Sequence, residues 1–175
     1  MVTIYDVDVN KLIDSLALKL KEYEQIAPPD WAKYVKTGNF KIRPPEDTDW
    51  WYKRSAAILR SVFILGPIGV SKLRRKYGGK KDRGCQPSIF RRGSGNIIRK
   101  VLFQLGEAGL VEKVDKGKNL GRKISPKGLS LLDNTAKEVV SRPSKTDKLE
   151  RPSKPAEKKD DTEKKEIKKE TPKGE

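Results

Sequence analysis

In this chain of 175 residues, the side chains best suited to a chemical role are the arginines and lysines between positions 53 and 100. This stretch, named here the basic block, contains 14 basic residues and one acidic residue, Asp82, for a net charge of +13. Positions 1–52 have a net charge of −2, and positions 101–140 have a net charge of +2. Charge that only keeps a protein soluble is interspersed with the opposite sign. The concentration of one sign therefore predicts a surface that binds a polyanion.

The basic block combines several groups that recognise phosphate. In the segment 91–96 (RRGSGN), guanidinium groups can each hold a phosphate through two hydrogen bonds, and glycine lets the backbone approach closely. The helix expected to follow adds backbone N–H groups and a positive dipole end. The predicted nucleic-acid contacts, all basic except one serine and including two residues of an expected hairpin, are Lys53, Arg54, Arg60, Lys72, Arg74, Arg75, Lys76, Lys80, Lys81, Arg83, Arg91, Arg92, Ser94, Arg99, Lys100, Arg122 and Lys123.

Other chemistry is poorly supported by the residue types. The chain has no His, so imidazole general-base catalysis and His-ligated metal sites are excluded. The single Cys85 can form neither an internal disulfide nor a thiolate cage, and no imidazole can activate it. The segment 66–72 (GPIGVSK) lacks the Gly-Lys-Ser/Thr ending of a phosphate-binding loop. We therefore expect that the chain is not an enzyme and that it binds no metal, cofactor or small-molecule substrate.

Neither a membrane span nor a signal peptide is expected. The longest run without a polar side chain covers 62–70, far short of the ~20 residues that cross a bilayer. Asp6 and Asp8 stand where a signal peptide would need a basic and then an apolar stretch. The sequence therefore predicts a soluble intracellular protein.

The C-terminal segment 141–175 differs from the rest in composition. It contains 12 basic and nine acidic residues, four prolines, no aromatic residue, and only Leu149, Ala156 and Ile167 as hydrophobics. Such a segment cannot bury enough apolar surface to offset the entropy lost on ordering. We predict a domain over 1–140 and a disordered, Lys/Glu-rich tail over 141–175.

Hydrophobic spacing predicts a mainly α domain with one short β-hairpin. Helices are expected over 10–24, over 49–65 with Thr48 or Asp49 as cap, and over 69–77, 94–108 and 126–140, with one or two further turns at 30–36. Strands at 110–114 and 122–125 frame the turn 115–121, and 80–93 should be loop or extended. Trp51 heads an apolar stripe and is predicted to be in the core, whereas Trp50 and Tyr52 could stack on bases or pack against the first helix.

The order of these elements is typical of a winged helix-turn-helix, in which three helices precede a two-stranded wing. The connection of some 14 residues between the second and third of these helices departs from the tight turn of DNA-binding versions. This departure favours a modified use of the fold.

Four segments in order, DTDWWYKRSAAILR, GVSKLRRKYGG, QPSIFRRGSGNIIRKVLFQLGEAGLVEK and GRKISPKG, resemble the S19e family of small-subunit ribosomal proteins of archaea and eukaryotes. The resemblance covers roughly residues 3–140. It implies a winged-helix-like core, a cytoplasmic place in the head of the small ribosomal subunit, ribosomal RNA and neighbouring ribosomal proteins as partners, and a part in subunit assembly and maturation. It also implies that the basic block is the RNA-facing side and that the region of Trp51, Arg54 and Arg60 belongs to the functional surface.

Two alternatives remain open from the residues alone. A winged-helix transcription regulator would bind duplex DNA as a dimer and read bases from the start of its third helix, where Asn96 is the main candidate. A protein-interaction module would use the aromatic N-terminal half. Sequence-selective footprinting on DNA would favour the first alternative over a ribosomal role.

The joint replacement Arg91→Ala and Arg92→Ala should weaken RNA binding more than it lowers the melting temperature. Each lost phosphate contact should flatten the log-log salt dependence of the binding constant by about 0.7–0.9. Titration of RNA at several salt concentrations, together with thermal denaturation, measures both. Equal losses of affinity and stability would indicate a packing role for these arginines instead.

Overall fold

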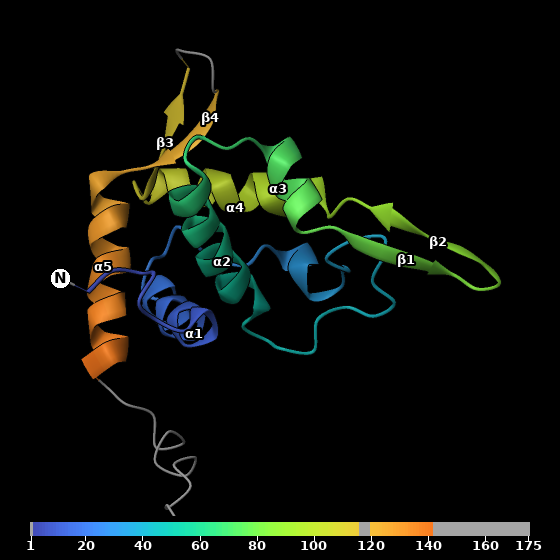
Figure 1. Cartoon of the computed structure of the whole chain (residues 1–175), viewed down its shortest axis with the longest axis horizontal. Helices are drawn as coiled ribbons and strands as arrows, with labels where there is room; N and C mark the ends of the chain where they lie inside the picture. Colours follow the sequence, from blue (N-terminus) through green and yellow to red (C-terminus); the bar gives the residue numbers. More distant parts are fainter. Residues whose placement is uncertain (1, 116–119, 142–175) are drawn as a thin grey trace, which may run out of the picture. The chain divides into compact units, whose positions relative to one another are not determined.

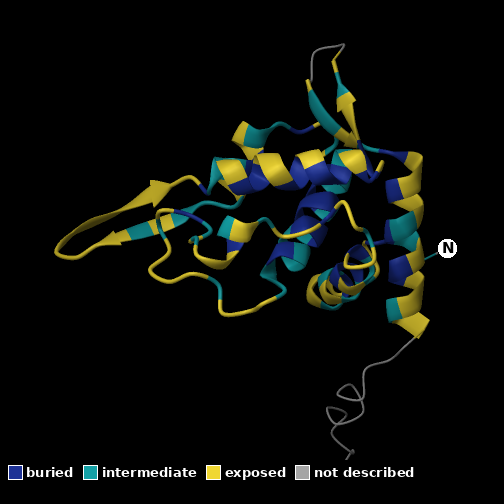
Figure 2. Ribbon diagram, turned by 180° about the vertical axis from the view of Figure 1, so that it is seen from behind, coloured by how far each residue is buried: buried dark blue, intermediate teal, exposed yellow. Residues whose placement is uncertain are grey.

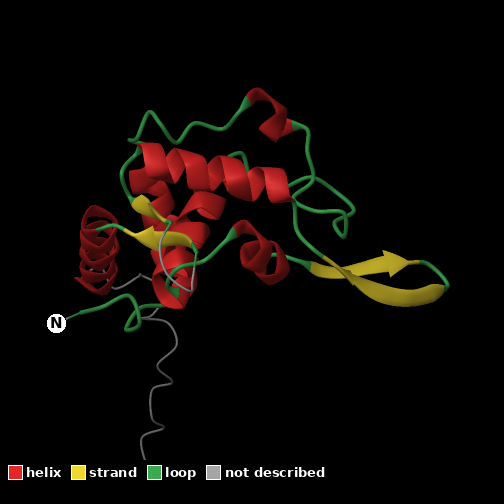
Figure 3. Ribbon diagram, turned by 90° about the horizontal axis from the view of Figure 1, so that it is seen from above, coloured by secondary structure: helices red, strands yellow, loops and turns green. Residues whose placement is uncertain are grey.

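The computed structural model describes residues 2–115 and 120–141. Elements follow in the order α1 (Val9–Leu20), a 3-10 turn η1 (Asp30–Lys33), α2 (Trp50–Leu65), α3 (Val70–Lys76), β1 (Gly79–Arg83), β2 (Gln86–Arg91), α4 (Gly95–Glu107), β3 (Val111–Val114), β4 (Gly121–Ile124) and α5 (Pro126–Ser141) (Figures 1 and 3). The mainly α, winged-helix-like class predicted from the sequence is confirmed. The predicted tail lies outside the described residues, apart from Ser141 at the end of α5.

Helix α2 lies at the centre of the core, in contact with α1, α4 and α5 (Figure 2). Its Trp51, Ile58 and Val62 are fully buried, which confirms the core position predicted for Trp51. Trp50 and Tyr52 are half-buried and pack against this core. Leu65 is 52% exposed because it is the last residue of α2 before the chain turns at Gly66.

A buried polar link joins α2, α4 and the segment after α1. The indole Nε1 of Trp51 donates to Gln104 Oε1 at 3.0 Å, and Gln104 Nε2 donates to the Ala27 carbonyl at 2.6 Å. Since a buried polar group without a partner is costly, these bonds allow an indole and an amide to lie inside the core.

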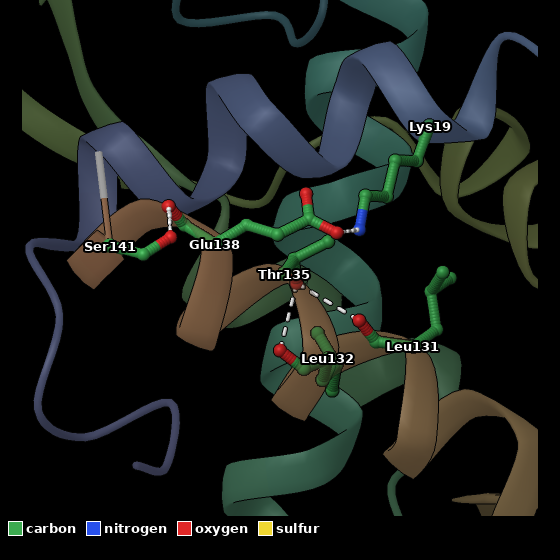
Figure 4. A network of polar contacts seen from close by, with 6 residues as sticks. All are labelled: Lys19, Leu131, Leu132, Thr135, Glu138 and Ser141. Atoms are coloured by element: carbon green, nitrogen blue, oxygen red, sulfur yellow. Dashed lines mark hydrogen bonds and ion pairs between the residues drawn. The ribbon is translucent and has the colours of Figure 1, made fainter.

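Helices α1 and α5 lie side by side along one edge of the core. Leu12, Leu16 and Leu132 are buried, and Lys19 Nζ reaches Glu138 Oε1 at 2.7 Å across the pair (Figure 4). In α5, the hydroxyl of Thr135 is turned back to the carbonyls of the preceding turn, so it is satisfied although it is buried (Figure 4). The α5 bounds predicted from sequence agree with the structure to within one residue.

The winged-helix unit consists of α2, α3, α4 and the wing β3–β4. Ile68, in the connection between α2 and α3, exchanges two backbone hydrogen bonds with Arg122 of β4, at 3.0 and 2.9 Å. Gly121 is required beside this contact, because a Cβ there would lie 2.6 Å from the Ile68 carbonyl carbon. The tip of the wing, 116–119, lies outside the described residues.

A second hairpin is the main feature that the sequence did not predict. Residues 80–93, expected as loop or extended, contain the antiparallel pair β1–β2, with an irregular register between Lys81 and Arg83. Pro87 fits in β2 because a two-stranded ribbon leaves one edge of each strand unpaired. Figure 1 shows this hairpin projecting away from the helices, between the ends of α3 and α4.

The end of α1 differs from prediction, whereas the N-cap of α2 lies at Asp49, one of the two predicted positions. Helix α1 ends at Leu20 rather than near residue 24, and the chain continues in turns that place Tyr23 against the core from outside the helix. Asp49 occupies the N-cap position of α2 without making a side-chain cap bond, because its carboxylate instead accepts from Lys21 Nζ at 2.6 Å.

The substitution Gln104→Leu should lower the free energy of unfolding, because it leaves the Trp51 N–H and the Ala27 carbonyl without their partner. We expect a cost of about 1–3 kcal/mol for each group that stays buried and unpaired. Urea denaturation measures it. Glu107→Gln, an exposed change on the same helix, is the matched control and should change stability by less than about 0.5 kcal/mol. Equal stability of the two variants would contradict a role for this link.

Candidate nucleic-acid interface

One face of α2 carries Trp50, Arg54, Ala57 and Ser61, as their three- and four-residue spacing requires. The Arg54 guanidinium lies over the Tyr77 ring, 4.6 Å from its centroid. Burial lowers the pKa of Arg54 and raises that of the Tyr77 hydroxyl. The packing of α2 on the core thus presents a stacked arginine next to the end of α3.

The Ser61 hydroxyl is the polar centre of this region. It donates its proton to the Ala57 carbonyl at 2.8 Å. A serine hydroxyl has one proton and two lone pairs, so its contacts with Lys76 Nζ at 2.8 Å and with Tyr77 Oη at 3.0 Å must both be accepted by Ser61. The hydroxyl is therefore saturated, and it fixes Lys76 and Tyr77 against α2.

Three cations crowd around this centre, and we name Arg54, Arg60 and Lys76 the α2–α3 cation cluster. Within residues 2–115 and 120–141, none of the three forms an ion pair with a carboxylate. Arg60 Nε is buried without a hydrogen-bond partner among the described atoms. Burial lowers the pKa of Lys76, and the positive charge of Arg60 lowers it further. The cluster is thus positive, partly desolvated and without a carboxylate to balance it, which is the chemistry of an anion site.

A second basic group surrounds the start of α4. Arg74 Nε donates to the Gly93 carbonyl at 3.1 Å, and the side chains of Arg74 and Arg99 both lie against Gly95. Ser94 is the N-cap residue, but its side chain makes no cap hydrogen bond, and its backbone N–H donates to the Thr37 carbonyl at 3.1 Å. The predicted contact Ser94 is therefore placed beside arginines, although its own backbone is already engaged.

The β1–β2 hairpin carries the third group of predicted contacts. Every residue of β2 is exposed, as Figure 2 shows. Lys81 donates to Asn39 Oδ1 at 3.0 Å, and Arg83 donates to Gln86 across the hairpin. The hairpin contacts are Lys80, Lys81, Arg83 and Arg91, with Arg92 directly after β2. Cys85 is exposed at the turn of this hairpin.

The remaining predicted contacts differ in how available they are. Lys53 is paired with Asp47 at 3.0 Å, and Lys123 is paired with Glu112 at 3.3 Å. Such exposed pairs are worth about 0–1 kcal/mol, so a phosphate could replace the carboxylate. The others are the exposed Lys72 and Arg75 of α3, the exposed Lys100 of α4, whose Nζ lies over the Phe103 ring, and the half-buried Arg122 of the wing.

The structure therefore divides the predicted residues into several groups rather than one patch. Sequence reasoning missed Ser61 and Tyr77, which hold the α2–α3 cation cluster in place. The shared helical face of Arg54 and Ser61 was a usable signal, but nothing in the sequence indicated that Tyr77 would fold back onto it. No helix in the described part of the chain is long and apolar enough to cross a membrane, and no group of potential metal ligands occurs there.

Comparison with known proteins gives one consistent family. The family model for ribosomal protein S19e matches residues 3–142. The chain belongs to the S19e family of ribosomal proteins. Small ribosomal subunit protein eS19 of Aeropyrum pernix is 49% identical over 148 residues, which cover 83% of this chain and 95% of the relative. The protein of the same name from Thermoplasma acidophilum is 42% identical over 147 residues, covering 84% and 95%. The A form from Schizosaccharomyces pombe is 41% identical over 143 residues, covering 82% and 97%.

These matches confirm the S19e resemblance inferred from the residues. The family match includes the whole winged-helix unit, the β1–β2 hairpin and α5, and it ends where the charged tail begins. The α2–α3 cation cluster thus belongs to the part of the chain that defines the family.

The substitution Lys76→Gln should lower affinity for small-subunit ribosomal RNA while leaving the melting temperature unchanged or raised. The folded chain carries a cost for protonated Lys76 that is present in full below the lowered pKa and is relieved only as the pH rises through it. Removing the charge at neutral pH removes this cost, and Gln retains a donor near Ser61. Filter binding and thermal denaturation give the two quantities, and a parallel fall in both would indicate a structural role for Lys76.

Proposed function

We propose that this chain is a non-enzymatic structural constituent of the small ribosomal subunit, located in the head of the cytoplasmic ribosome, where it binds ribosomal RNA and supports subunit assembly and maturation. Its partners are ribosomal RNA and neighbouring small-subunit proteins. The names of its relatives from Aeropyrum, Thermoplasma and Schizosaccharomyces support the ribosomal part of this proposal.

The observation that carries RNA binding is the α2–α3 cation cluster without carboxylate partners in the described chain. Burial lowers the pKa of Lys76, and the nearby positive charge of Arg60 lowers it further, so the two cations repel each other in the free domain. An RNA phosphate at this place would supply both the missing charge and an acceptor for Arg60 Nε. We therefore assign phosphate binding to this cluster first, and to the exposed hairpin and α4 groups second.

A scaffold role in assembly follows from the spread of these groups over separate elements. The β1–β2 hairpin projects beside the N-terminal end of α4, whereas the wing β3–β4 follows the C-terminal end of α4 (Figure 1). A rigid domain with basic groups at separated places can hold two parts of a folded RNA in a fixed relation. This arrangement supports a protein that stabilises RNA tertiary structure.

The DNA-binding alternative gains no support from the geometry. A regulator of that type inserts the start of its recognition helix into the major groove. Here the residues before α4 are tied to other parts of the domain, since Gly93 N–H donates to the Arg74 carbonyl at 2.9 Å and Gly38 bridges Gly93. The β1–β2 hairpin also stands where the tight turn of a DNA-binding domain would be.

Cosedimentation with small ribosomal subunits that lack this protein tests the proposal. Wild-type protein should pellet with the subunits at low salt, and Arg60→Gln should bind roughly tenfold or more weakly, as expected for a charged hydrogen bond worth about 1.5–3 kcal/mol. The salt slope should fall by about 0.7–0.9. Lys137→Gln, an exposed change on α5 outside the basic block, should bind as wild type does. Wild-type protein left in the supernatant would refute the proposal.

A further inference from the structure

A groove runs between α2 and the loop that follows η1. It has a volume of about 970 Å³, at the upper end of the about 300–1,000 Å³ typical of ligand sites. Trp50, Arg54 and Ala57 form its α2 side, and residues 40–47 form the opposite side. Tyr77, at the end of α3, also lines it. No residue of this loop was among the contacts predicted from sequence, whereas for Trp50 the sequence left open base stacking or packing against the first helix.

The lining of the groove combines flat rings with cations. Phe40, Trp50 and Tyr77 supply the aromatic surface, and Lys41 and Arg43 add positive charge from the loop. Trp50 is half-buried, held edge-on by Trp51 at a centroid distance of 5.3 Å and an interplanar angle of 78°. Part of its ring therefore lines the groove while its position is fixed by the core.

The electrostatics of the groove favour an anionic occupant. Of its two carboxylates, Asp47 is already paired with Lys53 at 3.0 Å, and Glu46 shares the lining with the cations Lys41, Arg43 and Arg54. Lys41 Nζ lies over the Phe40 ring at 5.6 Å, and Arg54 lies over Tyr77. Lys41 and Arg54 thus sit on ring faces rather than on acids, and an entering anion would not have to displace a carboxylate from Arg54.

The groove adjoins the α2–α3 cation cluster, because Arg54 belongs to both and Tyr77, which lines the groove, contacts the same Ser61 hydroxyl as Lys76. A phosphate held by the cluster would place the adjoining nucleotide at the mouth of the groove. Resting on the RNA binding proposed above, we propose that the groove takes an unstacked nucleotide of single-stranded RNA, with its base against Trp50 and its phosphate at Arg54. Aromatic and guanidinium surfaces are the usual platforms for splayed RNA bases.

Duplex RNA does not fit this site, because its bases are stacked on one another and their faces are covered. The expected specificity is therefore for a loop, bulge or end, whereas the exposed hairpin and α4 groups contact phosphates of either form. This difference makes the groove separable from general RNA binding.

The test compares two labelled probes, a uridine oligomer of about 10 nucleotides and a fully paired, blunt-ended RNA duplex without a loop, by anisotropy with the full-length chain. Trp50→Leu should weaken binding of the oligomer by roughly 5- to 100-fold, the range for loss of one stacked base. Binding of the paired probe should stay within about twofold. Trp50→Phe, which keeps a flat ring, should retain most of the affinity, and Tyr5→Leu, an exposed aromatic outside the groove, should bind both probes as wild type does.

A second variant guards against a folding defect at Trp50, which packs against the core. Arg43→Gln changes only the exposed loop side of the groove, and it should weaken the oligomer more than the paired probe. Its matched control is Lys33→Gln in η1, an exposed lysine that does not line the groove.

The outcomes separate the two proposals. If Trp50→Leu and Arg43→Gln weakened binding of both probes equally, or of neither, the proposal that the groove binds a nucleotide would be overturned. Weaker binding of both probes by Arg60→Gln would in that case still support the proposed RNA binding. If wild-type protein bound neither probe and did not pellet with subunits, RNA binding itself would fail. A selective loss of the oligomer in both groove variants supports the assignment.

Discussion

The burial of Trp51 fixes the orientation of α2, and most of the interface depends on that orientation. The ring lies fully inside the core, in edge-to-face contact with Trp31 at 5.7 Å, and its N–H is bound by Gln104. Once this side chain is inside, helical geometry leaves Trp50 and Arg54 on the neighbouring face, directed at the groove and at Tyr77. A change in the rotation of α2 would therefore separate Arg54 from Tyr77, and Ser61 from Lys76 and Tyr77.

The α2–α3 cation cluster is stabilised by packing and hydrogen bonds instead of by opposite charge. Exposed acids elsewhere on the domain pair readily with lysines, as between Lys21 and Asp49, so carboxylates are not scarce in the chain. They are absent where Arg60 and Lys76 approach each other, within the part of the chain that the structure describes. Ser61, which has no charge, holds Lys76 there by accepting its hydrogen bond. The free domain thus keeps a local repulsion between cations, and in the proposed function an RNA phosphate bound here would relieve it.

Much of the fold was predictable from periodicity, and much of the site was not. The apolar stripe containing Trp51 and Ile58, the glycine after α2 and the proline that begins α5 are local signals, and each gave the correct element. The pairing of β1 with β2 was missed because neither strand alternates apolar with polar residues: β2 is exposed along its whole length, and the half-buried positions of β1 are Gly79 and Lys81. The link from Ser61 to Tyr77 spans 16 positions and depends on how α3 packs, so no local pattern could predict it. The groove likewise needs the loop at 40–47, whose approach to α2 is a tertiary contact.

Charge located the interface, but charge alone cannot explain its shape. Lysines and arginines on a smooth surface would bind any phosphate backbone, with affinity set by the number of contacts and by salt. The S19e chain instead places Arg54 between two environments, with Tyr77 beneath its guanidinium and Trp50 on the same face of α2. A stacked guanidinium has its plane fixed, so its N–H groups point in defined directions and less entropy is lost when a phosphate binds. Under the proposed RNA binding, Trp50 would offer its ring to a base on the same helical face on which Tyr77 orients Arg54 for a phosphate, so both contacts would arise from one packing arrangement around α2.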